Sequence, residues 1–125
     1  MIGYAMFGTR DLPRAAAFYD ALLGELGAKR AMDTEQFIMW AVSPKAPMIA
    51  ICKPRDGQEA TVGNGTMIAL VADSSDKVDR IYNKAIALGA KDEGPAGPRG
   101  DTFYAGYFRD LDGNKLNVFC MTTSK

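Results

Sequence analysis

The chain has 125 residues, 47% of them apolar and 24% charged, and this composition predicts one globular domain over residues 1–125. Its 15 basic residues balance 15 acidic ones, which argues against nucleic acid or an anionic membrane as a partner. No apolar run approaches the ~18 residues of a membrane span, and no signal-peptide pattern is present. We therefore expect a cytoplasmic protein whose Cys52 and Cys120 are reduced.

Histidine is absent from the sequence. Its absence removes the usual acid or base near neutral pH, the commonest metal ligand, and every Ser-His or Cys-His nucleophile. Any chemistry here must rely on carboxylates, Lys, Tyr or Cys. The carboxylates Asp33, Glu35 and Glu93 have no spacing that indicates a catalytic pair.

The first half of the chain predicts a strand, a helix and three further strands. Asp11 before Leu12-Pro13 is a good helix start, because proline lacks an N–H that the first turn does not use. Gly24 and Gly27 end the helical pattern. The strands are expected at 2–8, 28–33, 36–42 and 47–53, and residues 54–64 are expected to form a linker rich in Pro, Gly and polar side chains.

The second half repeats this order. An apolar run at 67–71 predicts a strand, Ser74 or Ser75 caps a helix that ends at Gly89, and residues 94–101 predict a loop. The stretch 103–120 predicts a hairpin with a tight turn at 110–113, because an Asp-Gly pair between apolar runs favours a turn. Tyr19 and Tyr82 lie at matched helical positions, and both helices end near LGAK, so we infer a duplicated unit, with modules at about 1–55 and 65–122.

Two motifs carry a family resemblance. DGQEATVGNGT at 56–66 and GYFRDLDGNK at 106–115 resemble a bacterial subgroup of the vicinal-oxygen-chelate superfamily, which includes glyoxalases, bleomycin-resistance proteins and dioxygenases. The resemblance implies an α+β fold in which two βαβββ modules form a curved, mostly antiparallel eight-stranded sheet, a half-barrel cup with the helices outside. It also implies a homodimer, with the cup formed either within one chain or between two.

The metal ligands of that superfamily are missing from this sequence. The resemblance places its first-strand His or Gln at Tyr4, its second ligand at Met67 and its last-strand glutamate at Asn117. The fourth strand, which carries a further carboxylate in glyoxalases, has no acidic residue at 47–51. A divalent cation needs three or four convergent N, O or S donors, so we expect no metal and no other cofactor.

A pocket for a small organic ligand is the interpretation we favour for these positions. Asn117 in mid-strand would otherwise need a buried partner for its amide, and the indole N–H of Trp40 also needs one. A collapsed core with a direct Tyr4–Asn117 hydrogen bond is the alternative. The candidate ligand-binding residues are Tyr4, Trp40, Met67, Tyr104, Asn117 and Phe119. The assignment of Tyr104 to the cup depends on a hairpin register that pairs Gly106 with Asn117, and a shift of one residue would place Tyr107 there instead.

Three functions remain open at this point. The sequence favours a metal-free protein that binds a small, largely apolar molecule, as the resemblance to bleomycin-resistance proteins implies. The second is a glyoxalase-like or dioxygenase-like enzyme, a lyase or isomerase. It would use other metal ligands, or Tyr4 or Tyr104 as an acid. A scaffold with a filled cup is the third.

Asp110-x-Asp112-Gly113 lacks the spacing of a calcium loop and predicts a turn. Arg99 lies on a predicted loop and is either solvated or a clamp for an anionic group.

Overall fold

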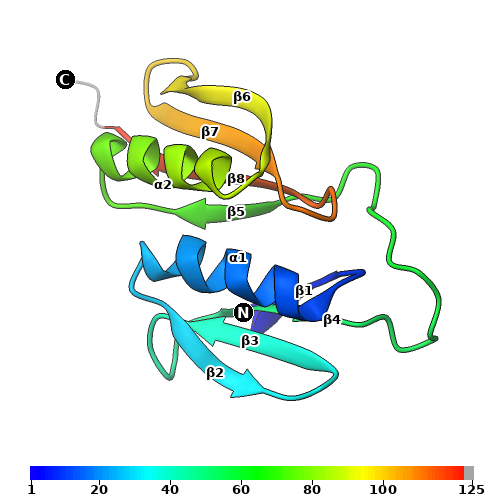
Figure 1. Ribbon diagram of the computed structural model, residues 1–125. Helices are drawn as coiled ribbons and strands as arrows, with labels where there is room; N and C mark the ends of the chain where they lie inside the picture. Colours follow the sequence, from blue (N-terminus) through cyan, green and yellow to red (C-terminus); the bar gives the residue numbers. More distant parts are fainter. Residues whose placement is uncertain (123–125) are drawn as a thin grey trace. The chain divides into compact units, whose positions relative to one another are not determined.

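The chain divides into two compact units, and the computed structural model describes residues 1–122. Unit 1 spans Met1–Val62, and unit 2 begins at Gly63. Each unit contains one helix and four strands in the order β-α-β-β-β (Figure 1). The α+β class and the two βαβββ modules expected from the repeat are therefore confirmed, and the eight strands lie in two four-stranded mixed sheets.

The sheet of unit 1 contains one parallel strand pair and two antiparallel pairs. Its elements are β1 (Tyr4–Gly8), α1 (Leu12–Gly24), β2 (Lys29–Asp33), β3 (Phe37–Ala41) and β4 (Met48–Cys52). The strand order is β1-β4-β3-β2, with β1 and β4 parallel. The Asp11 side chain accepts a hydrogen bond from the backbone N–H of Arg14 at 3.0 Å, which confirms the predicted start of the helix.

Unit 2 repeats this topology. Its elements are β5 (Ile68–Val71), α2 (Ser75–Ala87), β6 (Lys91–Pro98), β7 (Phe103–Arg109) and β8 (Lys115–Met121). The strand order is β5-β8-β7-β6, again with the first and last strands parallel. Ser74 caps α2 by accepting from the backbone N–H of Lys77, and Gly89 follows the helix with a φ of +104°, a conformation that favours glycine.

The strand β6 corrects the expected loop at 94–101, because residues 94–98 are extended and pair with β7. Its pairing register shifts between Asp92 and Gly94 and again between Gly94 and Gly97. β6 is the edge strand of its sheet, where a proline needs no ladder partner and bulges are tolerated. The Gly and Pro residues that suggested a loop are thus the irregularities of an edge strand.

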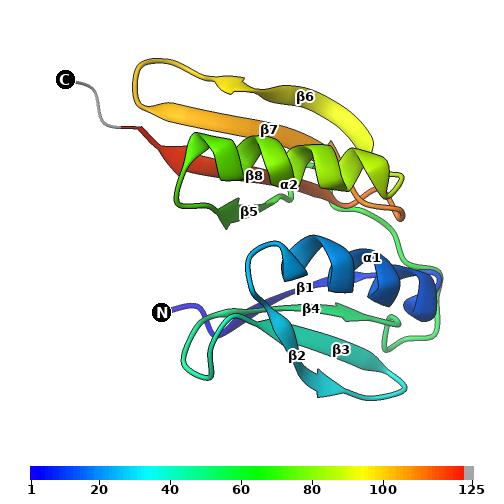
Figure 2. The same cartoon turned by 60° about the vertical axis from the view of Figure 1, so that its left-hand side comes forward.

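Each helix covers one face of the sheet in its own unit, as Figures 1 and 2 show. Buried side chains of the helix meet buried side chains of the sheet, and each large apolar group contributes roughly 1.5–3 kcal/mol when fully buried. Tyr19 on α1 and Tyr82 on α2 are both buried, as the repeat predicted. The buried sheet residues on the helix side include Phe7, Ile38, Trp40, Ile51, Leu70, Phe108, Leu116 and Val118.

The hairpin between β7 and β8 corrects the predicted register by one residue. The flanking pair is Arg109 with Lys115, so the loop contains the five residues 110–114 rather than the expected four. Asp110 organises this loop, since its Oδ1 accepts from the backbone N–H groups of Asp112 and Asn114 at 2.9 Å each. The DLDGN segment is therefore a turn held by hydrogen bonds within the loop, as predicted. The change in loop length, however, moves each side chain of β7 to the face opposite the expected one.

Neither helix in the described part of the chain has the length and apolar character needed to cross a bilayer.

Candidate functional site

Strand alternation leaves each sheet with one face that its own helix does not cover, which we call the helix-free face of that unit. In unit 2 the parallel pair Ala69–Asn117 and the antiparallel pair Tyr107–Asn117 place these three residues on the same face. The helix-free face of unit 2 contains Ala69, Val71, Phe103, Ala105, Tyr107, Arg109, Lys115, Asn117, Phe119 and Met121. Met67, directly before β5, continues the alternation of that strand. Apart from Arg109, Lys115, Asn117 and the Tyr107 hydroxyl, these side chains are apolar.

Asn117 is the buried polar residue of this face. It lies in β8, an inner strand of its sheet, and only 2% of its surface is exposed. Its Oδ1 atom is buried and accepts no hydrogen bond from any residue in the described chain. Leaving a buried amide oxygen without a partner costs about 1–3 kcal/mol. The amide oxygen of Asn117 therefore lacks, within the described residues, the partner that a collapsed core would supply.

The one-residue shift in the hairpin removes Tyr104 from this face and replaces it with Tyr107. Tyr104 pairs with Cys120, not with Phe119, so its side chain lies on the side of α2. Its hydroxyl donates to Asp79 Oδ1 on α2 at 2.6 Å, and this hydrogen bond raises the pKa of the Tyr104 phenol. The expected cup-side position of Tyr104 is wrong, because an odd loop length exchanges the two faces of β7.

Trp40 also lies on the helix side of its sheet, in unit 1. Only 2% of its surface is exposed, its ring lies 5.7 Å from that of Tyr19, and its indole Nε1 donates to Asp20 Oδ1 on α1 at 2.8 Å. The expectation that the indole N–H needs a partner is met, but that partner is a carboxylate of the chain. Trp40 therefore belongs to the core between α1 and β3 and not to the helix-free face.

Tyr4 lies on the helix-free face of unit 1, as expected. It is 53% exposed and pairs with Met48 across the parallel β1–β4 ladder. The face is rich in thioethers, since strand pairing places Met6, Met32, Met39 and Met48 with Tyr4, Phe37, Ala50 and Cys52. Burial raises the pKa of the Cys52 thiol, so this thiol stays protonated and apolar at neutral pH.

Met67 and Phe119 lie on the helix-free face of unit 2, also as expected. Met67 is 41% exposed and directly precedes β5. The Phe119 ring stacks on that of Phe103, with 5.3 Å between the ring centroids. Thioether and aromatic side chains of this kind adapt to irregular apolar ligands.

Two cations lie close to Tyr107 on the same unit. The Arg99 guanidinium carbon lies 5.5 Å from the centroid of the Tyr107 ring, and the Lys115 ammonium lies 5.6 Å from it. Both distances are within the range of cation–π attraction. The sequence placed Lys115 on the concave face and offered Tyr107 as the alternative to Tyr104, but neither was among the predicted ligand-binding residues. The signal that could have found Tyr107 is the odd number of residues in the DLDGN loop.

The residues at the superfamily's metal positions do not form a metal site. Tyr4, Met67 and Asn117 offer a neutral phenol, a thioether and a neutral amide, which bind divalent cations weakly. Within residues 1–122, no group of three or more His, Cys, Asp or Glu side chains is arranged to hold a metal ion. The side chains present therefore do not fit the divalent ion that the superfamily's ligand set would bind.

Comparison with known proteins shows the family. The chain matches the model described as Glyoxalase/Bleomycin resistance protein/Dioxygenase superfamily over residues 1–118. It is 36% identical to a glyoxalase/bleomycin resistance protein of known crystal structure from Albidiferax ferrireducens T118, with a TM-score of 0.88 over 96% of this chain and 98% of that chain. The chain therefore belongs to the glyoxalase/bleomycin resistance protein/dioxygenase superfamily.

More distant solved structures share the fold. A lactoylglutathione lyase from Agrobacterium tumefaciens is 21% identical, with a TM-score of 0.73 over 96% of this chain and 92% of that chain. A glyoxalase-related enzyme from Fulvimarina pelagi is 17% identical, with a TM-score of 0.76 over 100% of this chain and 99% of that chain. A search of the curated proteins gave no match.

Proposed function

We propose that this protein binds a small, largely apolar organic molecule, without a metal ion, on the helix-free faces of its sheets. The observation that carries the proposal is the buried Oδ1 of Asn117, which has no hydrogen-bond partner within the described residues. A fold keeps such an atom at a cost unless something else satisfies it. A ligand that donates a hydrogen bond to Asn117 supplies that partner.

The surrounding side chains support an apolar ligand. Thioether, aromatic and small aliphatic groups line both helix-free faces, and such groups bind by shape and apolar contact rather than by charge. The residues at the superfamily's metal positions support binding without a metal, since none of them is an anionic donor or an imidazole. Tyr104, one of the two tyrosines that a metal-free lyase or isomerase could use as an acid, has its hydroxyl bonded to Asp79 on the helix side.

A dye titration tests the binding of apolar molecules. Phenylnaphthylamine is a neutral aromatic amine that fluoresces in apolar surroundings, and we expect its emission to rise with saturation at one site. Val71→Lys places an ammonium at an exposed position of the helix-free face of unit 2 and should abolish the signal, because a dye bound over this position would take the ammonium out of water without a partner. Ile86→Lys on the exposed surface of α2 is the matched control and should leave it unchanged. Absence of saturable binding would favour a scaffold with a filled interior.

A cation screen tests the absence of a metal. We expect Zn²⁺, Ni²⁺ and Mn²⁺ to leave the melting temperature unchanged, whereas a ligand that binds the folded protein raises it further as its free concentration increases above the dissociation constant. An upward shift of several degrees with one of these cations, lost in a Met67→Leu and Asn117→Leu double variant, would replace the proposal with a metal-dependent enzyme. We also propose that the protein is a homodimer, which light scattering over a range of concentrations tests.

A further inference from the structure

The helix-free face of unit 2 has a polar end, which we define as Asn117, Tyr107, Lys115 and the neighbouring Arg99. Tyr107 is the strand partner of Asn117, and Lys115 lies two residues before Asn117 on the same face of β8. Arg99 follows β6 and reaches the Tyr107 ring from there. An amide, a phenol and two cations thus gather at one end of the face, beside Arg109, whose charge is balanced by Glu93.

The two cations of the polar end have no carboxylate partner. Within residues 1–122, Lys115 makes no ion pair, and the Arg99 guanidinium donates only to the backbone carbonyls of Pro95, Gly97 and Pro98. These carbonyl bonds hold Arg99 in place but do not neutralise it. The polar end therefore carries a positive charge that the chain does not balance.

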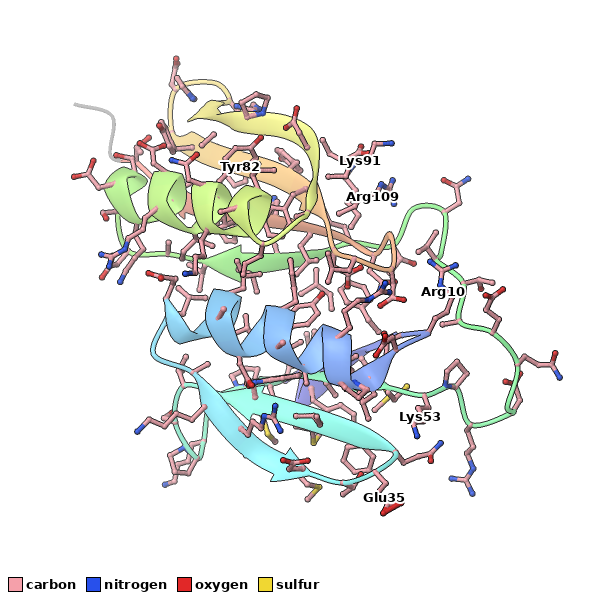
Figure 3. All side chains as sticks on the ribbon, in the orientation of Figure 1. Arg10, Glu35, Lys53, Tyr82, Lys91 and Arg109 are labelled. Carbon is pink, nitrogen blue, oxygen red and sulfur yellow. The ribbon has the colours of Figure 1, made fainter. Side chains whose placement is uncertain are left out.

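One acidic side chain on that part of the sheet is already paired with a cation. Glu93 on β6 accepts from Arg109 Nε at 3.0 Å, and Arg109 also donates to the carbonyl of Gly113. Lys91, the strand partner of Arg109, adds a further positive charge at this end of the sheet, where Figure 3 shows both side chains. The local field consequently favours an anion.

We propose that the ligand is an aromatic organic acid, an inference that rests on the proposed binding function. Its carboxylate or similar oxyanion lies beside Lys115 and Arg99, and its aromatic body lies along Tyr107 and the stacked Phe119. A hydroxyl or N–H on that body donates to Asn117 Oδ1. This arrangement gives a partner to the unsatisfied amide oxygen and a counter-charge to the cations in one binding event.

Two dyes that differ by one anionic group test the inference. Anilinonaphthalene sulfonate carries a sulfonate, and phenylnaphthylamine is the same aromatic amine without it. We expect the sulfonate to bind the wild-type protein about tenfold more tightly, as one charge-assisted contact provides. Its affinity should also fall with added salt, whereas that of the neutral dye should not.

Variants of Lys115 separate charge from packing. Lys115→Met keeps the apolar stem and should weaken the sulfonate about tenfold while leaving the neutral dye within about twofold. Lys115→Arg should keep the preference for the sulfonate. Lys84→Met on α2 removes the same charge from the helix side of unit 2 and should change neither affinity.

A variant of Asn117 separates a binding role from a structural role. Asn117→Leu removes the unsatisfied amide at similar volume, so we expect a higher melting temperature together with weaker binding of both amines. A lower melting temperature would show that the amide serves the fold, and would overturn its role as a ligand contact.

The outcomes distinguish the two proposals. Equal affinity for the two dyes, or equal effects of Lys115→Met on both, would overturn the preference for an acid and leave apolar binding intact. Failure of both dyes to bind wild-type protein would overturn the binding function itself.

Discussion

The two units share one topology, but their helix-free faces differ at matched positions. The pairs Met6–Ala50 in unit 1 and Ala69–Asn117 in unit 2 occupy the same place in the parallel ladder, so Ala50 corresponds to Asn117. By the same register Met39 corresponds to Tyr107, and Met48 to Lys115. Unit 1 shows that apolar side chains satisfy the fold at all three positions. The topology that the two units share therefore does not require the polar set of unit 2.

The helix-covered faces of the two sheets also differ at a matched position. Unit 2 has a glycine there, and unit 1 has a large residue. Gly106 on β7 corresponds to Ile38 on β3. A Cβ atom on Gly106 would lie 2.9 Å from Cδ1 of Tyr82 and 3.2 Å from Cα of Ala96. The Tyr82 ring thus takes the space that a sheet side chain takes in unit 1, and Figure 3 labels Tyr82 beside α2.

Placing the unit 1 residue in unit 2 should have the largest effect. Gly106→Ile forces a branched side chain against the Tyr82 ring and the backbone of Ala96, and we expect unfolding to become easier by about 3 kcal/mol or more. Urea unfolding measures the change. Gly3→Ala is the control, because no atom lies within 4 Å of the added carbon. We expect it to leave the free energy of unfolding nearly unchanged. A Gly106→Ile protein as stable as wild type would refute the assigned contact with Tyr82.

Tyr82 also gives unit 2 a dependence on alkaline pH. Burial, together with a hydrogen bond to Asp92 at 2.6 Å, raises the pKa of Tyr82 from 10.0 to about 12. Between these values the folded protein keeps a proton that the unfolded chain loses, so stability falls as the pH rises. Between neutral pH and pH 12, we expect the free energy of unfolding of the wild type to fall by about 2 kcal/mol more than that of Tyr82→Phe. Equal losses in the two proteins, measured by urea unfolding, would contradict this.

The helix–sheet link of unit 1 depends on Asp20. Its Oδ1 accepts from the Trp40 indole, and it pairs with Arg30 at 2.7 Å; the bond to Arg30 is the main cause that lowers the pKa of Asp20. Asp20→Ala leaves the buried indole N–H without an acceptor and should cost about 1–2 kcal/mol in thermal or urea unfolding. Asp20→Asn keeps a carbonyl acceptor and loses only an exposed ion pair, so about 0.5 kcal/mol is expected. Equal costs would show that the ion pair, not the indole, matters.

Placing a unit 2 residue in unit 1 should have the smallest effect, and a favourable one. Gly24 is the last residue of α1 and corresponds to Ala87, the last residue of α2. No atom lies within 4 Å of a Cβ built on Gly24. Gly24→Ala should therefore stabilise the protein by about 0.5–1 kcal/mol, because it restricts the unfolded chain. A decrease in melting temperature would contradict the equivalence of the two helix ends.

Much of the site could be predicted because strand alternation is local. Tyr4, Met67, Asn117 and Phe119 lie on the faces that alternation assigned to them. Trp40 could not be placed in this way, since its partner Asp20 comes from a helix that is distant in sequence. Tyr104 was misplaced, because the sequence does not reveal how many residues the Asp110 carboxylate would draw into the turn.

The sequence by itself determined the repeated βαβββ order and the helix caps, which follow from periodicity and from capping and turn residues that act within a few positions. Its resemblance to a family implied the α+β class and the absence of that family's metal-binding side chains. Only the tertiary structure decided that Tyr107 shares a face with Asn117 and that Asn117 Oδ1 has no partner among the described residues. Both depend on the pairing of separate strands. One residue more or less in a loop moves every side chain of the paired strand to the opposite face of the sheet.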